Sequence, residues 1–487
     1  MREDRREKQP TLFRDDVGMA EPRRVFDFVI VGAGMIGSSA ARHLSHLLSD
    51  ATDRPNRIAI IGPDEPDPKD AFSHDGPFAS HYDEGRITRE LDAHPVWLRL
   101  ARESIRRYAA IEQEGGLPFY TGSGFLCLTQ ESEPYCQQVE RTAKEFAVEY
   151  QRLGREELME RFPCMNLPVD CVGLFQSEQA GHISPRAFVR CQLKAAMKRG
   201  VVHIPSSVER VAQHEQQQAN SNKRGLRQVM LTSGQCIHAR TVIVATGAFT
   251  EPALLDGVDM KLHVQGRTVL LADVTDHVRN NTLPGLNRLP SIIQAIRSKG
   301  SVGTEDATSL YDVYLLPPVL YPDGRWYLKI GTGDFAHPLL TPSDKKEWFK
   351  QKQHQEGTAG AAEAQRLWQT VCSLYPFLLP GTFITANCAL TYTSSGLPII
   401  QEVSEGIVAA VGGNGAAAKS ADEIGRLAAL VALRKWDESG MYEEEVFRLN
   451  GGNGKKKPKA IDKECLPMGH HLRAVGAGAQ HQLPAKL

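Results

Sequence analysis

The chain has 487 residues, 41% of them hydrophobic, and a formal net charge of −1, so it can bury a sizeable two-part core. The balanced charge offers no bulk attraction to nucleic acid or to an anionic membrane, and no apolar run reaches transmembrane length, so neither partner is expected. Nine cysteines are scattered without a Cys-x-x-Cys pair, so we expect no zinc or other metal, and their odd number favours a reducing compartment.

Residues 1–24 are rich in charge and lack an apolar segment, which predicts a disordered lead-in rather than a targeting signal. The stretch FVIVGAGMIG, residues 28–37, is followed by apolar residues at helical spacing. A buried strand, tight turn and helix in this order is the context in which G-x-G-x-x-G indicates dinucleotide binding; the alternative is a glycine-rich turn without a ligand. The residues expected at the cofactor are Gly32, Gly34, Met35, Ile36 and Gly37.

The second strand, residues 57–61, does not end in the acidic residue that binds ribose in a Rossmann unit. Gly62 and Pro63 follow it instead, and Asp64 and Glu65 come only afterwards. Either one of these two carboxylates reaches back to the ribose, or the ribose is held in another way.

Arg86 and Arg89 close a polar, glycine-bearing loop that spans residues 71–90. In a doubly wound fold this loop lies near the cofactor, and two arginines three residues apart share one face if a helix begins here. The planar guanidinium fork suits a carboxylate or a phosphate. The alternative is a solvated pair neutralised by Asp83, Glu84 or Glu90.

The central part of the chain is predicted to alternate helices and strands. Residues 92–115 are expected to form one helix, and residues 184–199 another with Ser184 as its cap. The buried strand TVIVATG then ends at Thr246 and Gly247, where a parallel sheet is expected to meet the cofactor again.

Residues 260–375 are predicted to form a second, antiparallel region in which Lys329 lies in mid-strand. A lysine there is either functional or extends to solvent from an edge strand. The chain then returns to the first domain with a strand over residues 406–411, a glycine loop and a helix. This second strand, loop and helix predicts a discontinuous nucleotide domain, with its second glycine loop at residues 412–415.

With these pieces placed, residues 25–435 resemble the monomeric sarcosine oxidase, N-methyltryptophan oxidase and pipecolate oxidase group of the FAD-dependent D-amino-acid oxidase family. The stretch SHYDEGRITR, residues 80–89, is similar to the family's S-H…R-I-I-R segment. The resemblance implies that Arg89 binds the substrate carboxylate. It also implies flavin contacts at Ser80, His81 and Arg86.

Three further positions carry the resemblance. Residues 328–331, LKIG, are similar to the strand whose lysine activates oxygen over the flavin, which implies that role for Lys329. Residues 388–393, CALTYT, are similar to the segment whose cysteine is bonded to the flavin 8-methyl group. The resemblance therefore implies covalent FAD through Cys388; the alternative is a small core residue. The position of Val208 implies a backbone contact with adenine.

The second glycine loop departs from the family pattern. Its similarity to the family's G-H-G loop implies flavin contacts at Gly413, Asn414 and Gly415, with Asn414 in place of the histidine. The family's lysine that helps to bind the substrate carboxylate falls on Ala417. Lys419, two positions later, is the candidate substitute. Together with the missing ribose acid at Gly62, these differences leave the substrate more open than the cofactor.

The resemblance implies an α/β (α+β overall) fold, with a Rossmann-type FAD-binding domain and a mixed or antiparallel-sheet substrate domain. The expected FAD-binding segments are residues 25–95, 181–255 and 386–440. The expected substrate-domain segments are residues 96–180 and 256–385, and residues 441–487 are expected to be a flexible tail.

The implied function is an FAD-dependent oxidase acting on CH–NH, which oxidises the C–N bond of a small amino acid or an N-methyl or secondary amine, with oxygen as acceptor and hydrogen peroxide as product. Two alternatives stay open: a dehydrogenase of the same fold with another acceptor, and a low-turnover flavin-binding assembly factor. The last residues, Ala485-Lys486-Leu487, are similar to the peroxisomal S-K-L address. We therefore expect the peroxisomal import receptor as a partner and a peroxisomal location, with the cytoplasm as the alternative.

Overall fold

The computed structural model of the protein describes residues 25–49, 57–70, 76–131, 133–167, 169–213, 225–298, 309–332, 338–350 and 360–449. The expected lead-in over residues 1–24 and the terminal Ala485-Lys486-Leu487 lie outside these residues.

The first sheet is built from segments that are far apart in the sequence. At its centre, β1 (Val25–Val31) is parallel to β2 (Ile58–Ile61) on one side and to β12 (Cys236–Val244) on the other. The apolar end of β1 is buried, as a strand covered on both faces requires. The sheet is completed by β9 (Val202–Ile204), β10 (Val208–Gln213), β11 (Arg227–Leu231), β19 (Ile399–Ser404) and β20 (Ile407–Val411).

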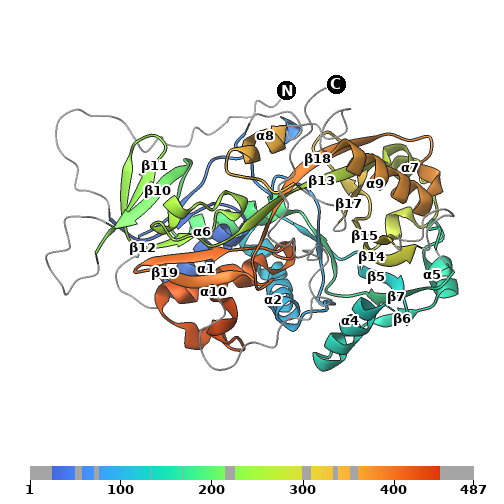
Figure 1. The fold of residues 1–487 in the computed structure, drawn as a ribbon, viewed down its shortest axis with the longest axis horizontal. Helices are drawn as coiled ribbons and strands as arrows, with labels where there is room; N and C mark the ends of the chain where they lie inside the picture. The colour runs from blue at the N-terminus through green and yellow to red at the C-terminus, as the bar shows by residue number, and fades with distance from the viewer. Residues whose placement is uncertain are drawn as a thin grey trace, which may run out of the picture.

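Helices α1 (Met35–Ser49), α6 (Pro185–Lys198) and α10 (Ala421–Leu433) pack on this sheet, on the left in Figure 1. Ser184 caps α6 as predicted, because its hydroxyl accepts a hydrogen bond from the Ala187 N–H at 3.1 Å. The helices α1 and α10 are in close contact, since a Cβ at Gly425 would fall 2.5 Å from the Ser39 Cβ. The two helices that follow the glycine loops are therefore neighbours.

The prediction of a single helix over residues 92–115 is wrong. The structure has α2 (Pro95–Arg106) and α3 (Tyr108–Gly115), which are separated at Arg107. At this break the Arg107 guanidinium turns to buried carboxylates of α10.

The second sheet, on the right in Figure 1, is mixed, with β5 and β14 parallel and its other strand pairs antiparallel. In order along the sheet its strands are β18 (Phe383–Tyr392), β13 (His263–Asp273), β17 (Trp326–Thr332), β15 (Ser309–Leu315), β14 (Ser291–Ser298), β5 (Phe125–Gln130), β7 (Cys171–Gln176) and β6 (Gln151–Leu153). Beside β17 lies the short β16 (Val319–Leu320). Its helices are α4 (Pro134–Glu145), α5 (Arg155–Arg161), α7 (Thr275–Arg279), α8 (Asp344–Lys350) and α9 (Ala361–Leu374).

A small sheet of β3 (Arg86–Thr88), β8 (Gly181–Ile183) and β4 (Tyr120–Thr121) completes the strands of the described residues. This architecture confirms the predicted α/β fold with a second, mixed sheet. Strand β18 runs through the boundary expected at residue 386, so one continuous strand leads from the second sheet towards the second glycine loop.

The sequence predicts a flexible tail from residue 441, but regular structure continues beyond that residue. Residues 444–447 form a short 3-10 helix, and Phe447 is fully buried against the Trp436 and Tyr442 rings. An aromatic side chain of this size stabilises the end of the described chain by apolar burial.

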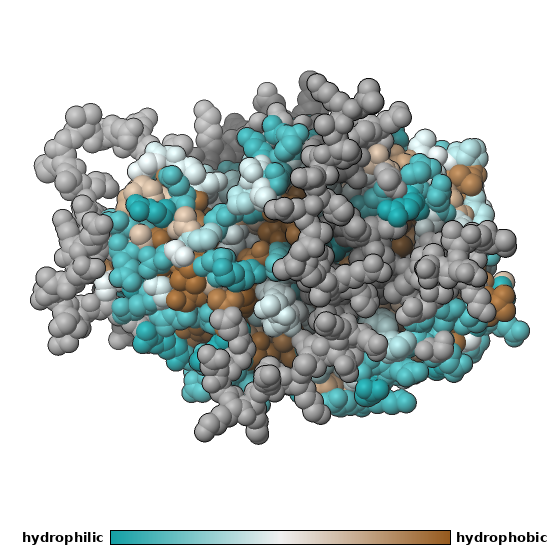
Figure 2. Space-filling view, in the orientation of Figure 1, coloured by the Kyte–Doolittle hydropathy of each residue, from teal (hydrophilic) through white to brown (hydrophobic). Residues whose placement is uncertain are grey.

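No helix in the described ranges combines the length and the apolar character needed to cross a bilayer. On the face shown in Figure 2, hydrophilic residues cover most of the coloured surface, and hydrophobic residues show mainly near the middle.

Candidate active site

The first glycine loop lies where the ends of β1 and β12 meet. A Cβ at Gly32, whose φ is +104°, would fall 2.5 Å from the Ala245 carbonyl oxygen and 3.2 Å from the Thr246 nitrogen. Only glycine fits this approach. Thr246 and Gly247, predicted from the end of a separate strand, are therefore brought directly beside the loop.

The remaining glycines of the loop serve different purposes. A Cβ at Gly37 would fall 1.8 Å from the Gly32 oxygen, so Gly37 permits close packing of turn and helix. A Cβ at Gly34 would meet only His81 Nδ1, at 3.7 Å, so the space beside it is open. Gly34 directly precedes α1, and the first backbone N–H groups of a helix lack helical acceptors. The loop fits the pyrophosphate of a dinucleotide.

The absence of an acid at Gly62 has a steric cause. A Cβ there would fall 2.5 Å from the Ala33 Cβ, so no acidic side chain fits at this strand end. Glu65 does not reach back, because it pairs with Arg186 and, at 3.0 Å, with Arg190 on α6. Its neighbour Asp64 is largely exposed. Asp64 lies 4.0 Å from His203 Nδ1, and His203 Nε2 lies 3.0 Å from the Gly62 oxygen, so Asp64 stays near the strand end whereas Glu65 is engaged by α6.

The other predicted cofactor residues lie around this loop or on the same sheet. His81 is half-buried, and burial together with nearby arginines lowers its pKa to about 3, so its ring is neutral at physiological pH. The Ser80 carbonyl accepts a hydrogen bond from Arg86 Nη2 at 2.8 Å. Val208 begins β10 and packs into an apolar cluster that includes Val29 of β1.

The second glycine loop is braced by Asn414, the residue that departs from the family pattern. Asn414 has a left-handed φ of 48° and is 1% exposed. Its side-chain oxygen accepts from the Thr393 N–H at 2.9 Å, and its Nδ2 donates to the Gly412 oxygen at 2.6 Å. The Gly413 N–H donates to Thr391 Oγ1 at 3.1 Å. The Asn414 amide therefore fixes the loop to the end of β18.

A cavity of about 180 Å³ lies between this loop and the second sheet. Its wall includes Cys388, Asn414 and Gly415, which the sequence predicts at the cofactor. Its charged wall residues are Arg86, Arg89, Asp92, Arg267 and Lys419.

Arg89, Asp92 and Lys419 form what we call the Asp92 cluster. Asp92 Oδ2 lies 2.9 Å from Arg89 Nη1 and 3.0 Å from Lys419 Nζ. All three side chains are at least nine-tenths buried, and the Arg89 guanidinium lies 4.8 Å from the centre of the Phe125 ring. Lys419 therefore lies beside Arg89, as expected for the substitute lysine, although it comes two residues after Ala417, where the family has its lysine.

The charges of the Asp92 cluster do not cancel. Against the effect of burial, Lys419 and Arg89 hold the pKa of Asp92 well below its usual range. Burial, only partly offset by Asp92, lowers the pKa of Lys419 to about 8. At neutral pH the cluster therefore has two cations and one anion, and its net charge of +1 suits an incoming carboxylate.

The two arginines do not share a helix face, which corrects the helical expectation. Arg86 begins strand β3, and Arg89 follows the end of that strand. The solvated alternative is also wrong for Arg89, which is 7% exposed. Their side chains reach the same cavity because the chain bends after β3.

Arg86, Asp83 and Lys329 form a second group, the Asp83 cluster. Asp83 pairs with both cations, and Lys329 Nζ also donates to the Gly85 oxygen at 2.7 Å. Lys329 is 1% exposed on β17, which lies between β13 and β15, so it does not extend to solvent from an edge strand. Burial, assisted by Arg86, lowers the pKa of Lys329 well below its usual value.

Cys388 lies on β18 at the cavity wall. It is 9% exposed, and its Sγ lies 3.9 Å from Arg86 Nη2. Its carbonyl accepts a hydrogen bond from Trp348 Nε1 at 2.9 Å, which holds this part of the strand in place. The structure thus brings Cys388 together with Arg86 and the second glycine loop.

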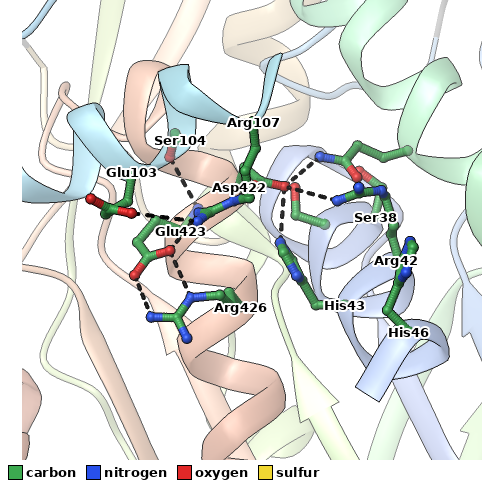
Figure 3. Close-up of polar contacts among 12 residues, drawn as sticks. Ser38, Arg42, His43, His46, Glu103, Ser104, Arg107, Asp422, Glu423 and Arg426 are labelled. Atoms are coloured by element: carbon green, nitrogen blue, oxygen red, sulfur yellow. Dashed lines mark hydrogen bonds and ion pairs between the residues drawn. The ribbon is translucent and has the colours of Figure 1, made fainter. Parts of the chain in front are cut away.

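A buried ionic network joins the helices that follow the two glycine loops (Figure 3). Asp422, in the first turn of α10, accepts a hydrogen bond from Arg107 Nε at 2.6 Å, and its Oδ1 lies 3.1 Å from His43 Nε2 of α1. Arg107 also pairs with Glu423 at 2.5 Å. Lys419 precedes Asp422 by three residues in the turn η7 (Ala418–Ser420), so the network fixes the turn that presents Lys419.

Sequence reasoning missed Asp92 and Arg267 and named Asp83 only as a solvated partner of the two arginines, a pairing that the structure shows for Arg86. Asp92 and Asp83 each lie three residues from a predicted arginine, so the local spacing contains a signal for both. Arg267 has no local signal, because its place in the site depends on the pairing of β13 with β18.

The chain belongs to the FAD dependent oxidoreductase (DAO) family, which it matches over residues 27–430. FAD is therefore its cofactor, and both glycine loops fit that role. The peroxisomal sarcosine oxidase of Homo sapiens is 23% identical over 245 residues, 50% of this chain and 56% of that protein. The monomeric sarcosine oxidase of Streptomyces avermitilis is 27% identical over 176 residues, 36% of this chain and 42% of that protein. The chain spans about half the length of these curated relatives.

Solved structures of similar fold extend over most of the chain. NikD, described as an unusual amino acid oxidase essential for nikkomycin biosynthesis, has a TM-score of 0.64 at 17% identity, covering 87% of this chain and 97% of its own. Glycine oxidase from Geobacillus kaustophilus has a TM-score of 0.61 at 17% identity, and the match covers 88% of this chain and 100% of that one. At such identities the likeness shows the fold alone.

Proposed function

We propose that this FAD-dependent oxidoreductase is an oxidase that acts on the CH–NH group of a small amino acid or an N-methyl or secondary amine, with oxygen as the electron acceptor. The observation that carries the proposal is the Asp92 cluster, whose net positive charge faces the same cavity as Cys388 and the second glycine loop. The printed names of the relatives, sarcosine oxidase and N-methyl-L-tryptophan oxidase, support the same substrate class.

The residues of the cavity have separate tasks in this proposal. Arg89 and Lys419 bind the substrate carboxylate, and Asp92 holds both cations in position. The first glycine loop, Thr246 and Gly247 hold the pyrophosphate side of FAD, while Cys388 and the second glycine loop border its ring. The bound flavin supplies the two-electron redox chemistry.

The overall reaction balances without a nucleophilic triad. The amine loses two electrons and two protons and becomes an imine, to which water adds, releasing the amine and leaving a carbonyl compound. Oxygen takes up the two electrons and two protons as hydrogen peroxide. Lys329 and Arg86, which share the Asp83 carboxylate, supply positive charge where oxygen becomes anionic.

The experiment is a screen of amino acids and N-methylated amines against the purified holoenzyme, with peroxide release and oxygen uptake as readouts. Stoichiometric peroxide from an amine with a carboxylate supports the proposal. Reduction of the flavin by substrate, followed by slow reoxidation in air, identifies the dehydrogenase instead. Flavin that no amine reduces identifies the low-turnover assembly factor. A peroxide product is compatible with the peroxisomal location suggested by the last three residues.

We further propose that Cys388 Sγ is bonded to the 8-methyl carbon of FAD in place of the thiol proton and one methyl hydrogen, with the two electrons released passing through the flavin to oxygen. Precipitation of the holoenzyme with acid tests this directly, since a covalent flavin stays with the pellet. Cys388→Ala is expected to release all of the flavin to the supernatant. As a matched control, Cys372→Ala, which removes another buried thiol on α9, leaves the flavin in the pellet. If the flavin of the unmodified enzyme goes to the supernatant, it is not covalently bound, and Cys388 is a small core residue instead.

A further inference from the structure

One buried cation on the cavity wall has no task in the proposed function. Arg267 lies in the middle of β13, opposite Cys388 of β18, and is 5% exposed. Its Nη2 donates hydrogen bonds to Gln265 Oε1 at 3.1 Å and to Tyr392 Oη at 2.7 Å. Its Nε and Nη1 are also shielded from solvent, but they have no hydrogen-bond partner among the described residues.

Such an arginine requires an explanation. A guanidinium stays charged at physiological pH, and nearly all buried N–H groups in proteins find an acceptor. Glu363 of α9 interacts electrostatically with Arg267, but burial raises the pKa of Glu363 to about 7 against the opposing effects of Thr268 and Arg267. Glu363 is therefore only partly ionised at neutral pH and does not supply a full counter-charge.

The cavity wall as a whole has the same excess of positive charge. Arg86, Arg89, Arg267 and Lys419 line it, and Asp92 is the carboxylate among the lining residues. Asp83 lies next to Arg86 but is shared with Lys329. One substrate carboxylate at the Asp92 cluster leaves Arg267 uncompensated in a largely buried site, where an unpaired charge is unfavourable.

We propose that Arg267 binds a second acidic group of the substrate, so that the preferred substrate is an amino acid with two carboxylates. This inference rests on the proposed function. The first carboxylate binds at Arg89 and Lys419, and the second accepts hydrogen bonds from Nε and Nη1 of Arg267. The bonds from Nη2 to Gln265 and Tyr392 hold the guanidinium in a fixed plane, so its remaining donors are oriented before the substrate arrives.

The test measures binding to the holoenzyme by non-oxidisable acids of matched length. Succinate is compared with butyrate, and glutarate with valerate, using the change in flavin absorbance and the shift in melting temperature. At least one diacid is expected to bind about tenfold or more tightly than its monoacid. In Arg267→Gln this preference is lost, while monoacid affinity stays within about threefold. Arg325→Gln is the control, because it removes an exposed arginine that pairs with Asp273 at the end of the same strand.

Three outcomes overturn the inference. The first is equal affinity of the unmodified enzyme for diacids and monoacids, which needs no variant. The second is an Arg267→Gln variant that weakens both series alike. The third is an Arg267→Gln variant that changes the flavin spectrum while the diacid preference remains. If Arg267→Gln does not fold, Arg267→Lys keeps the charge but removes the Nε donor, and a retained diacid preference then contradicts the hydrogen-bond assignment.

Paired substrates distinguish the position of the second carboxylate and separate this inference from the proposed function. Aspartate and glutamate of both configurations are compared with their amides, and iminodiacetate is compared with N-methylglycine, by peroxide release. A preference in the first set places the second acid on the side chain, and a preference in the second set places it on the nitrogen substituent. Oxidation of monocarboxylic amino acids without any diacid preference overturns this inference alone, whereas no oxidation of any amine overturns the proposed function.

Discussion

The Asp92 cluster and the Asp83 cluster have the same composition, one aspartate between an arginine and a lysine, but they differ in their relation to the cavity. Arg89 and Lys419 both line the cavity, whereas in the Asp83 cluster Arg86 lines it and Lys329 bonds to a backbone carbonyl behind it. The first cluster therefore presents two cations to a ligand, and the second presents one.

Their surroundings also differ. Lys419 lies 5.9 Å from the centre of the Trp97 ring, and Arg89 packs on Phe125, so the Asp92 cluster adjoins aromatic rings that do not neutralise it. Asp83 also accepts a hydrogen bond from the Tyr321 hydroxyl at 2.8 Å. In the proposed function, the same ion-pair chemistry binds the substrate where both cations face the cavity, and it positions side chains where they face the protein.

The largest expected effect follows removal of the shared carboxylate. Asp92→Asn leaves two buried cations without a counter-ion and is expected to lower the free energy of unfolding by about 3–5 kcal/mol. Asp83→Asn is expected to cost less, since the Asp83 and Arg86 side chains are 17% and 22% exposed. Urea unfolding of both holoenzymes at pH 6.5, where Lys419 is charged, measures the difference. Equal losses contradict the distinction between the clusters.

The next effect concerns substrate affinity. Lys419→Met removes one of the two cations that face the ligand and is expected to lower kcat/KM for a carboxylate-bearing amine by about 30- to 1,000-fold, or roughly 2–4 kcal/mol. Lys435→Met, a surface lysine paired with Glu438, serves as the control and should not change kcat/KM. An unchanged KM in Lys419→Met refutes the carboxylate role.

Lys329→Met tests the role of the Asp83 cluster. It is expected to leave reduction by substrate within a few-fold of normal and to slow reoxidation by oxygen by about 10²- to 10³-fold, because a charge that stabilises the anionic product is lost. Stopped-flow measurement of the two half-reactions separates them. Lys345→Met removes another buried lysine ion pair, with Glu251 at 2.5 Å, and should affect neither. A variant that slows both half-reactions alike argues for a structural Lys329.

The smallest effect is a pH dependence specific to the Asp92 cluster. Because the pKa of Lys419 is lowered to about 8, the lysine is protonated below this pH and loses its charge as the pH rises through it. The value of kcat/KM is therefore expected to fall above about pH 8, by at most tenfold per pH unit. Lys419→Arg keeps the charge and should remove this limb of the profile. A profile unchanged in Lys419→Arg assigns the limb to another group.

The sequence by itself determines the parts of this protein whose signals are local. The apolar run before Gly32, the two glycine loops and the Ser184 cap are each defined within about ten residues, because strand burial, turn formation and helix capping depend on neighbours along the chain. Arg89 and Lys329 are candidates because short stretches around them, residues 80–89 and 328–331, carry the family resemblance.

The tertiary structure alone decides how these pieces meet. The strand conformation at Arg86 overrides the helical spacing, and steric contact with Ala33 explains why Gly62 carries no acid. Lys419 reaches Asp92 although 327 positions separate them, because η7 and the segment after β3 pack against the same cavity. Arg267 enters that cavity through the register of β13 with β18. Register and packing are long-range properties, and a single sequence contains no local record of them.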